Sequence, residues 1–212
     1  MKIHVVGGTK FDSQLGVNIL TSHKLASSPI AISSTPYQQT QMQSNDVLRL
    51  EKIIYSKLSK YNEDMFMIFC NSLSFAVDWN RISKHVNCNF LNLTSVYELL
   101  ACNYSKIAVL AANNITLHRI CKFLTKLSPG ISIIGFSMLP LVEWVEKRDS
   151  RVEKVLNNLM QLSIELGAEA FVLGCTHFEF YSFKNETIKI IYPGKILVDQ
   201  LLKFLQENSE EE

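Results

Sequence analysis

The sequence has no excess of charge of either sign, no membrane-length apolar run and no closely paired cysteines. Lys and Arg number 21 against 20 Asp and Glu, so the net charge is +1, and no basic stripe indicates nucleic acid or an anionic membrane surface as a partner. The longest apolar runs have the length of strands, which argues against a transmembrane helix. The apolar start before Gly7-Gly8 is too short for a signal peptide. We therefore expect a cytoplasmic protein with no nucleic-acid or membrane partner.

Cysteine usage argues against two further classes of protein. The five cysteines stand at positions 70, 88, 102, 121 and 175, and no two of them form a CxxC pair. An odd number without such pairs argues against a disulfide framework and against a thiolate zinc site. A reducing compartment fits this pattern.

What the sequence does contain is a regular alternation of strand-like and helix-like segments. Its 212 residues are 47% hydrophobic and 19% charged, as in an ordinary folded protein. The alternation predicts an α/β fold with parallel sheets and right-handed crossovers. We expect a polar loop over 34–40 and a turn at Pro193-Gly194. The expected strands are 2–6, 29–33, 65–69, 89–91, 106–110, 131–134 and 171–173, and the expected helices are 13–25, 46–58, 74–85, 94–103, 114–126, 138–147, 150–166 and 196–205.

Two of the expected strands end in a cysteine that is followed by small polar residues. The apolar run Phe171-Val172-Leu173 leads into Gly174-Cys175-Thr176-His177. In the same way, the run from Met65 to Phe69 leads into Cys70-Asn71-Ser72. Ligands of parallel sheets bind at the carboxyl ends of strands, where Gly8 is also expected. The matched contexts predict two thiols that face one cleft.

The spacing of the two cysteines predicts the domain organisation. About half of the chain separates them, which is typical of two pseudo-symmetric halves. We assign residues 1–95 plus 190–212 to a first α/β lobe that carries Cys70. Residues 96–189 form a second α/β lobe that carries Cys175, and the final helix is too short to stand alone.

Two thiols in one cleft suit the inversion of a carbon centre that carries a weakly acidic proton. One group removes the α-proton of an amino acid and the other delivers a proton to the opposite face, so each cysteine is base in one direction and acid in the other. Helix N-termini favour the thiolate form that the base requires. Asn71, Ser72 and Thr176 would donate hydrogen bonds to the substrate carboxylate, together with nearby backbone N–H groups.

Each of these side chains also has a purely structural interpretation. Free cysteine is among the most buried residue types, and the three cysteines outside the two strand-end motifs fit inert packing. His177 could cap or pack, or it could stabilise a neighbouring thiolate when protonated. Glu143, taken alone, is a surface carboxylate on a helix. The matched contexts of the two strand-end cysteines favour a chemical role for them over this structural interpretation.

At these residues the sequence resembles the aspartate/glutamate racemase superfamily, whose members use two cysteines and no cofactor. Residues 174–177 resemble the second-cysteine motif of glutamate racemases, and residues 70–78 resemble the first-cysteine motif, in which Cys-Asn-Thr is usual. Residues 7–13 are similar to the opening Gly-Gly loop of the aspartate branch. Residues 35–37 and 140–143 resemble glutamate-racemase segments. The match runs in order through nearly the whole chain.

The resemblance implies two α/β lobes with the active site between them and neither metal nor cofactor. It also implies a small-molecule amino-acid substrate, and it leaves room for a homodimer because family members often dimerise. Within the site, the acid/base residues would be Cys70 and Cys175, with His177 and Glu143 as auxiliaries, and the substrate contacts would come from Gly8, Asp12, Ser13, Tyr37, Asn71, Ser72 and Thr176.

Three functions remain open from the sequence. The first is a racemase of aspartate or glutamate, with Lys10 or Arg49 as candidate cations for the side-chain carboxylate. The second is related chemistry on the same scaffold, such as that of a hydantoin racemase or a maleate isomerase. The third is a non-catalytic protein that binds a small carboxylate, because residues 110–114 lack the threonines with which relatives often hold substrate. A decarboxylase would normally keep one of the two cysteines, so the presence of both argues against it.

Overall fold

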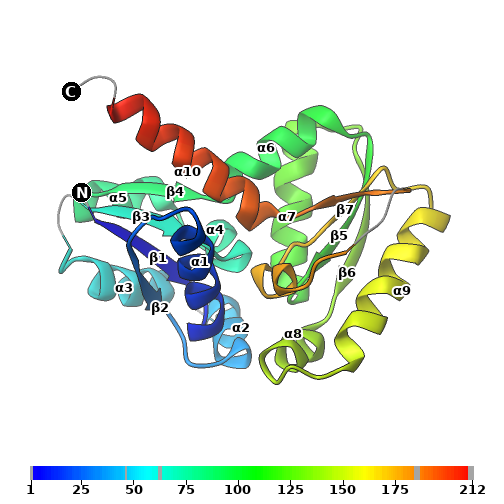
Figure 1. Ribbon diagram of the computed structural model, residues 1–212, viewed down its shortest axis with the longest axis horizontal. Coiled ribbons are helices and arrows are strands. Elements are labelled where there is room, and N and C mark those ends of the chain that lie inside the picture. The colour runs from blue at the N-terminus through cyan, green and yellow to red at the C-terminus, as the bar shows by residue number, and fades with distance from the viewer. Residues whose placement is uncertain (1, 46, 62–63, 184–186, 210–212) are drawn as a thin grey trace.

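The computed structural model describes residues 2–45, 47–61, 64–183 and 187–209, and within them it contains two separate parallel sheets (Figure 1). The first has the strand order β2-β1-β3-β4 and the second the order β6-β5-β7-β8. Helices flank both sheets, which confirms the predicted two-lobed α/β fold. The strands are β1 (Ile3–Gly7), β2 (Ser27–Ala31), β3 (Met65–Ile68), β4 (Asn89–Asn92), β5 (Lys106–Ala111), β6 (Ser132–Ser137), β7 (Ala170–Val172) and β8 (Lys189–Ile191).

The helices follow the expected order, with a few differences at their ends. They are α1 (Lys10–Ser22), α2 (Pro36–Asn45), α3 (Val47–Leu58), α4 (Asn71–Ala76), α5 (Trp79–Val86), α6 (Thr94–Asn103), α7 (Asn114–Leu127), α8 (Leu139–Glu146), α9 (Arg151–Glu165) and α10 (Pro193–Ser209), with a short 3-10 helix η1 (Thr176–Phe180). No helix in this described part of the chain is both long and apolar enough to cross a membrane.

Three expectations about local structure were wrong. The turn expected at Pro193-Gly194 is the start of α10, because proline suits the first helical position. The helix expected over 74–85 is split, because Val77 is extended and the Asp78 side chain accepts a hydrogen bond from Arg81 N to start α5. The polar loop expected over 34–40 becomes helical at Pro36, because proline suits the first helical position and Thr35 Oγ1 accepts a hydrogen bond from Gln38 N. The helix that begins at Pro36 therefore lies beside the carboxyl ends of β1 and β3.

The central strands of both sheets are buried on both faces. Every residue of β1 and β3 is buried, as are all residues of β5 except its first. Strands covered on both sides need continuous apolar runs, which is why these segments were recognisable in the sequence. Their pairing is parallel throughout, so the carboxyl ends of β1 and β3 lie at one edge of the first sheet and those of β5 and β7 at one edge of the second.

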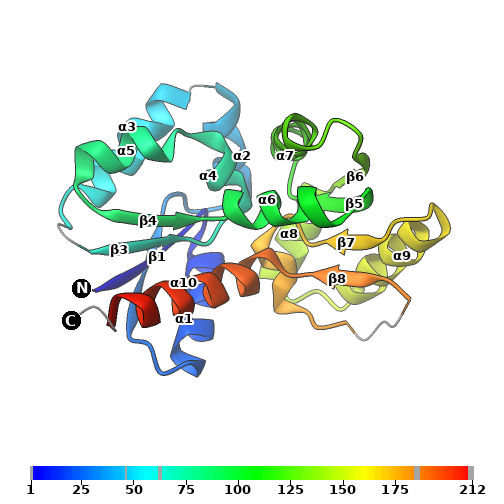
Figure 2. The ribbon, with the colours of Figure 1, turned by 90° about the horizontal axis from the view of Figure 1, so that it is seen from above.

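The chain crosses between the two sheets by way of α6 and α10. Strand β8 pairs with β7 in the second sheet, and α10, which follows it, packs against α1, β4 and α6 (Figure 2). The predicted boundaries of the two lobes remain a prediction.

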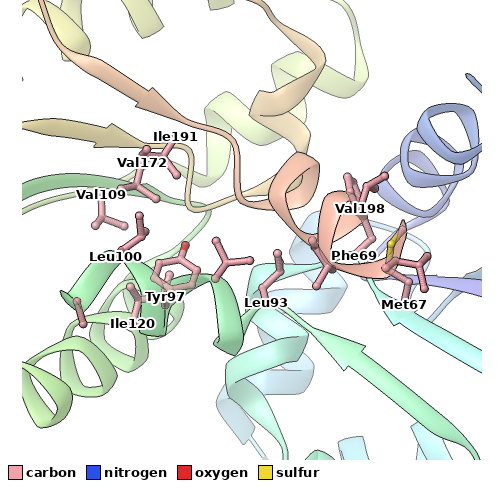
Figure 3. Close-up of a cluster of buried hydrophobic side chains, with 14 of the residues drawn as sticks. Met67, Phe69, Leu93, Tyr97, Leu100, Val109, Ile120, Val172, Ile191 and Val198 are labelled. Atoms are coloured by element: carbon pink, nitrogen blue, oxygen red, sulfur yellow. The ribbon is translucent and has the colours of Figure 1, made fainter. Parts of the chain in front are cut away.

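One hydrophobic cluster joins the two sheets through these helices. It contains Met67 and Phe69 from the end of the first sheet, and Val109 and Val172 from the second (Figure 3). Side chains of α6 and α10, with Leu93 just before α6, lie between them; those of the helices include Val96, Tyr97, Leu100, Leu197, Val198 and Leu201. Burying each large side chain of this kind contributes about 1.5–3 kcal/mol. The cluster therefore fixes the spacing between the sheets.

Replacing Leu100 by Ala tests the shared cluster. Leu100 is 4% exposed, and its truncation removes packing on which both sheets rely, so we expect the free energy of unfolding to fall by about 2–5 kcal/mol. Leu99→Ala is the matched control, because Leu99 lies on the same helix and is 50% exposed. Urea unfolding of the two variants measures the difference, and equal losses would contradict a core shared through α6.

Candidate active site

Cys70 and Cys175 occupy equivalent places at the ends of two strands. Cys70 follows β3 and precedes α4, with φ −159° and ψ 116°. Cys175 follows β7 and precedes η1, with φ −146° and ψ 125°. Both are free and buried, and both line one cavity between the two sheets. The structure thus brings together the two thiols that the sequence singles out.

Gly8, at the end of β1, makes room for the first thiol. A Cβ atom at this position would lie 3.0 Å from Cys70 Sγ and 3.3 Å from Gln39 Cδ. Contacts this short require the neighbouring atoms to shift, so a side chain here would displace the thiol or the amide. The absence of a side chain at Gly8 is therefore part of the shape of the cleft.

The cavity is small in this structure. The centre of a water molecule can move through only about 20 Å³, which is room for about one water. A bound amino acid therefore requires the walls to move apart. The cavity is lined by Gly8, Thr9, Asp12, Pro36, Gln39, Thr40, Cys70, Asn71, Ser72, Ala112, Asn113, Leu139, Val142, Gly174, Cys175, Thr176 and His177.

His177 links the second thiol to a carboxylate. Its Nδ1 lies 3.6 Å from Cys175 Sγ, and its Nε2 lies 2.9 Å from Glu146 Oε1. Burial alone lowers the pKa of His177, but the negative charge and hydrogen bonding of Cys175, together with Glu146, raise it to about 10. The raised pKa favours the imidazolium form of His177, whose Nδ1 faces Cys175 Sγ.

Thr9 and Phe11, at the start of α1, contact this ion pair from the other side of the cleft. Thr9 Oγ1 donates to Glu146 Oε1 at 2.8 Å, and the ring of Phe11 stacks on that of His177 with centroids 5.0 Å apart. Burial raises the pKa of Glu146, but the hydrogen bonds from His177 and Thr9 outweigh it and lower that pKa below its ordinary value. The network joins the loop after β1 to α8 and η1.

Asp12 shapes the opening loop. Its carboxylate accepts hydrogen bonds from the backbone N–H groups of Gly8 at 2.9 Å and Thr9 at 2.7 Å. Burial raises the pKa of Asp12, and His177 and these N–H groups counter part of the rise. With its oxygens occupied in this way, Asp12 fixes the loop at the start of α1.

The two thiols differ in their electrostatic surroundings. Burial raises the pKa of the Cys70 thiol strongly, and the nearby Asp12 carboxylate raises it further, although Ser72 Oγ lies 3.3 Å from its sulfur. Cys70 is therefore protonated at neutral pH, whereas Cys175 has an imidazolium beside it. The site thus holds a thiol whose pKa is raised by burial on one side, and a thiol next to the ring of His177 on the other.

Two amide side chains present unused hydrogen-bonding atoms to the cleft. Asn71 Oδ1 accepts a hydrogen bond from Tyr97 OH at 2.7 Å, while its Nδ2 is buried without a partner in the described part of the chain. In the side chain of Gln39, neither the amide nitrogen nor the amide oxygen is paired there. Native proteins pair most buried polar atoms, so these atoms are suited to a ligand.

The residues singled out in the sequence divide into two groups. Eight line the cleft: Gly8, Asp12, Cys70, Asn71, Ser72, Cys175, Thr176 and His177. The other three do not: Ser13 is buried and donates to Lys10 O, Tyr37 is 57% exposed, and Glu143 lies half-buried on α8. Lys10 and Arg49 also lie outside the lining. The functional roles assigned to all of these residues remain predictions.

Sequence reasoning missed several residues that the structure brings to the site. Glu146, three positions after Glu143 on α8, is the carboxylate that contacts His177. Its spacing of one helical turn from Glu143 was the available signal, but one sequence does not show which carboxylate faces the cleft. Thr9, Gln39, Thr40 and Asn113 also line it.

Replacing Glu146 by Gln tests the ion pair through its pH dependence. The Glu146 contribution is present above its ordinary pKa of 4.5 and is lost as the pH falls through its lowered value in the fold. The His177 contribution is complete below the ordinary pKa of 6.5 and is lost as the pH rises through about 10. We expect the stability difference between parent and variant to be largest at about pH 5–6.5 and to shrink towards about pH 10.

Urea unfolding across this pH range, with Glu143→Gln as the control on the same helix, measures the effect. A difference between parent and Glu146→Gln that does not change with pH would contradict a charged pair.

Comparison of the sequence with known proteins finds a partial likeness. No model of a known protein family matches the chain. A glutamate racemase of Limosilactobacillus reuteri is 34% identical over 82 residues, which are 37% of this chain and 31% of that protein. The chain thus aligns with less than a third of the length of this curated relative.

Solved structures match over almost the whole chain. The glutamate racemase of Francisella tularensis, in complex with D-glutamate, has a TM-score of 0.74 at 17% identity and covers 98% of this chain and 82% of its own. An aspartate racemase homologue from Pyrococcus horikoshii has a TM-score of 0.66 at 15% identity and covers 96% and 98%. The chain therefore has the two-lobed α/β fold of the glutamate and aspartate racemases, which confirms the fold implied by the resemblance seen in its sequence.

Proposed function

We propose that this chain is an isomerase: a cofactor-independent racemase that interconverts the L and D forms of an acidic amino acid, aspartate or glutamate. The observation that carries the proposal is the pair of free, buried thiols of Cys70 and Cys175, which line one cleft from the ends of two strands. Matched acid/base groups suit a reaction whose substrate and product are mirror images.

Proton transfer conserves charge within the pair of thiols. In one direction the Cys175 thiolate takes the α-proton and becomes a thiol, and the electron pair of the C–H bond passes to the substrate carbanion. The Cys70 thiol then gives its proton to the opposite face and becomes a thiolate. The reverse direction exchanges the two roles. His177 supports the thiolate at Cys175, and burial supports the thiol at Cys70.

The α-carboxylate has donors close to both cysteines. Negative charge builds up on this group as the α-proton leaves, so hydrogen bonds to it stabilise the transition state. The unpaired Nδ2 of Asn71 and the hydroxyl of Ser72 line the cleft beside Cys70, and Thr176 lines it beside Cys175. Tyr97 OH orients Asn71, because it donates to the amide oxygen and leaves the amide N–H groups for the cleft.

Acidic substrates are favoured by the comparisons. One structural neighbour is a glutamate racemase in complex with D-glutamate, another is an aspartate racemase homologue, and the partial sequence match is to a glutamate racemase.

In keeping with the odd number of cysteines, all of them free, we propose the reducing cytoplasm as the location of this protein. A homodimer is also proposed, and light scattering of the purified chain tests it.

A non-catalytic protein that binds a small carboxylate is the second candidate. Ala112 lines the cleft in the segment where the resemblance leads us to expect threonines that hold substrate. The cavity is also lined by side-chain amides with unpaired atoms, which are suited to binding a carboxylate without catalysing a reaction. A hydantoin racemase or maleate isomerase would use the same two thiols on a different substrate.

Replacing Cys70 or Cys175 by Ser distinguishes the two candidates. A hydroxyl keeps the shape but is a far weaker acid than a thiol, so we expect racemisation to fall by orders of magnitude in both directions. Exchange of the α-proton with solvent deuterium should survive from one enantiomer only, the one whose base remains. Cys102→Ser, at an exposed position of α6, is the control and should leave turnover intact.

Polarimetry of each enantiomer of aspartate and glutamate, with mass spectrometry for deuterium, provides the readout. If both strand-end variants racemise at the parent rate, the two-thiol mechanism is wrong. If the parent binds these acids without turnover, the binding protein is the correct interpretation.

A further inference from the structure

Gln39 is the most conspicuous polar side chain of the cleft that the proposed reaction leaves without a role. It lies on α2 and is 5% exposed, and its Nε2 and Oε1 are both buried without a hydrogen-bond partner among the described residues. Leaving such atoms unpaired costs about 1–3 kcal/mol each. An amide with both atoms unpaired in a ligand cleft is therefore suited to a polar group of the ligand.

The amide lies on the Cys70 side of the cleft. Gln39 Cδ and Cys70 Sγ are 3.3 Å and 3.0 Å from the same point, the place where a Cβ of Gly8 would be. Gln39 and the thiol thus border one small space. A substrate carbon that reaches Cys70 brings its substituents within reach of this amide.

Helix α2 is held in place across the cleft by contacts with α7. Asn113 Nδ2 donates to Thr40 Oγ1 at 3.1 Å, and Thr116 Oγ1 donates to Gln43 Oε1 at 3.3 Å. These bonds join a helix beside the first sheet to a helix beside the second, close to Gln39 in sequence. They hold the segment around Gln39 against the start of α7, so its amide borders the cleft from that side.

The charges that line the cleft limit which groups can bind a second oxygen-bearing group of the substrate. The described residues that line it include no Lys or Arg, and the positive charge of His177 is already paired with Glu146 and faces Cys175. The donors Asn71, Ser72 and Thr176 are assigned to the α-carboxylate. A second oxygen-bearing group of the substrate must therefore be bound by neutral N–H groups, and Nε2 of Gln39 has both of its hydrogens free.

We propose that Gln39 determines substrate specificity: its amide N–H donates to a distal carbonyl oxygen on the substrate side chain. This rests on the proposed racemase function. Side-chain carboxylates and side-chain carboxamides share this oxygen, so the inferred substrate class is α-amino acids with a distal carbonyl group. A site built to hydrogen-bond such a group discriminates against substrates that lack it, because its own polar atoms are then left unpaired.

Replacing Gln39 by Met tests the proposal, since Met has a similar shape and no amide. The measurement is kcat/KM for aspartate, glutamate, asparagine and glutamine, each divided by the value for alanine, which has no distal carbonyl. We expect the ratio for the preferred substrate to fall about tenfold or more, mainly through KM, with alanine little changed. Gln41→Met, at an exposed position of the same helix, is the control and should keep the parent ratio.

Replacing Gln39 by Glu separates the two kinds of distal group. A carboxylate at this position repels a side-chain carboxylate, so turnover of an acidic substrate should fall further than in Gln39→Met. A carboxamide substrate can still donate to the oxygens of the introduced carboxylate, and should be favoured relative to its acid. If both variants keep the parent ratios, Gln39 does not bind the distal group. The same conclusion follows if both variants lower kcat/KM for all substrates, alanine included, by the same factor.

Calorimetric titration of the parent and Gln39→Met with the same amino acids separates this inference from the proposed function. A parent that binds without turnover ends the racemase proposal, whereas loss of that binding in Gln39→Met still supports the role of Gln39. A parent that neither binds nor turns over any of these amino acids overturns both.

Discussion

The packing of α6 and α10 between the two sheets is the constraint on which the site depends. The cysteines stand at the ends of β3 and β7, strands of different sheets, so their separation follows from how the sheets are held. One hydrophobic cluster runs from Phe69, next to Cys70, through α6 to Val172, close to Cys175. The same cluster contains Tyr97, whose hydroxyl orients Asn71. The contacts that pack this core therefore also position the residues of the candidate site.

Electrostatics then makes the two thiols unequal within a nearly symmetric frame. Cys175 has the imidazolium of His177 beside it, whereas Cys70 is buried with the Asp12 carboxylate in its vicinity. A two-base reaction needs one thiolate and one thiol at the start of each turnover. In the proposed reaction the His177–Glu146 pair supplies this difference, and a hydrogen bond from Thr9 joins the pair to the loop that contains Gly8. Side chains from both halves of the chain thus contribute to the surroundings of the two thiols.

Much of the frame was readable from the sequence because its signals are local. Buried parallel strands require continuous apolar runs, so the segments that end at Cys70 and Cys175 stand out. Helix α2 was missed because its residues are polar, although Thr35-Pro36 is a helix-start signal. The choice between Glu143 and Glu146, and the approach of Gln39 to Gly8, depend on how elements pack. Contacts between segments distant in the sequence leave no trace in one chain read alone.

The central claim is that this cleft exchanges the α-proton of an acidic amino acid with solvent while inverting its centre. The most direct measurement is incubation of the purified chain with L-aspartate, and separately L-glutamate, in deuterated water, followed by circular dichroism and mass spectrometry. The account predicts that the signal of one of them decays to zero and that the D product carries one deuterium at the α-carbon. Constant ellipticity with both acids, or inversion without deuterium in the product, would contradict it.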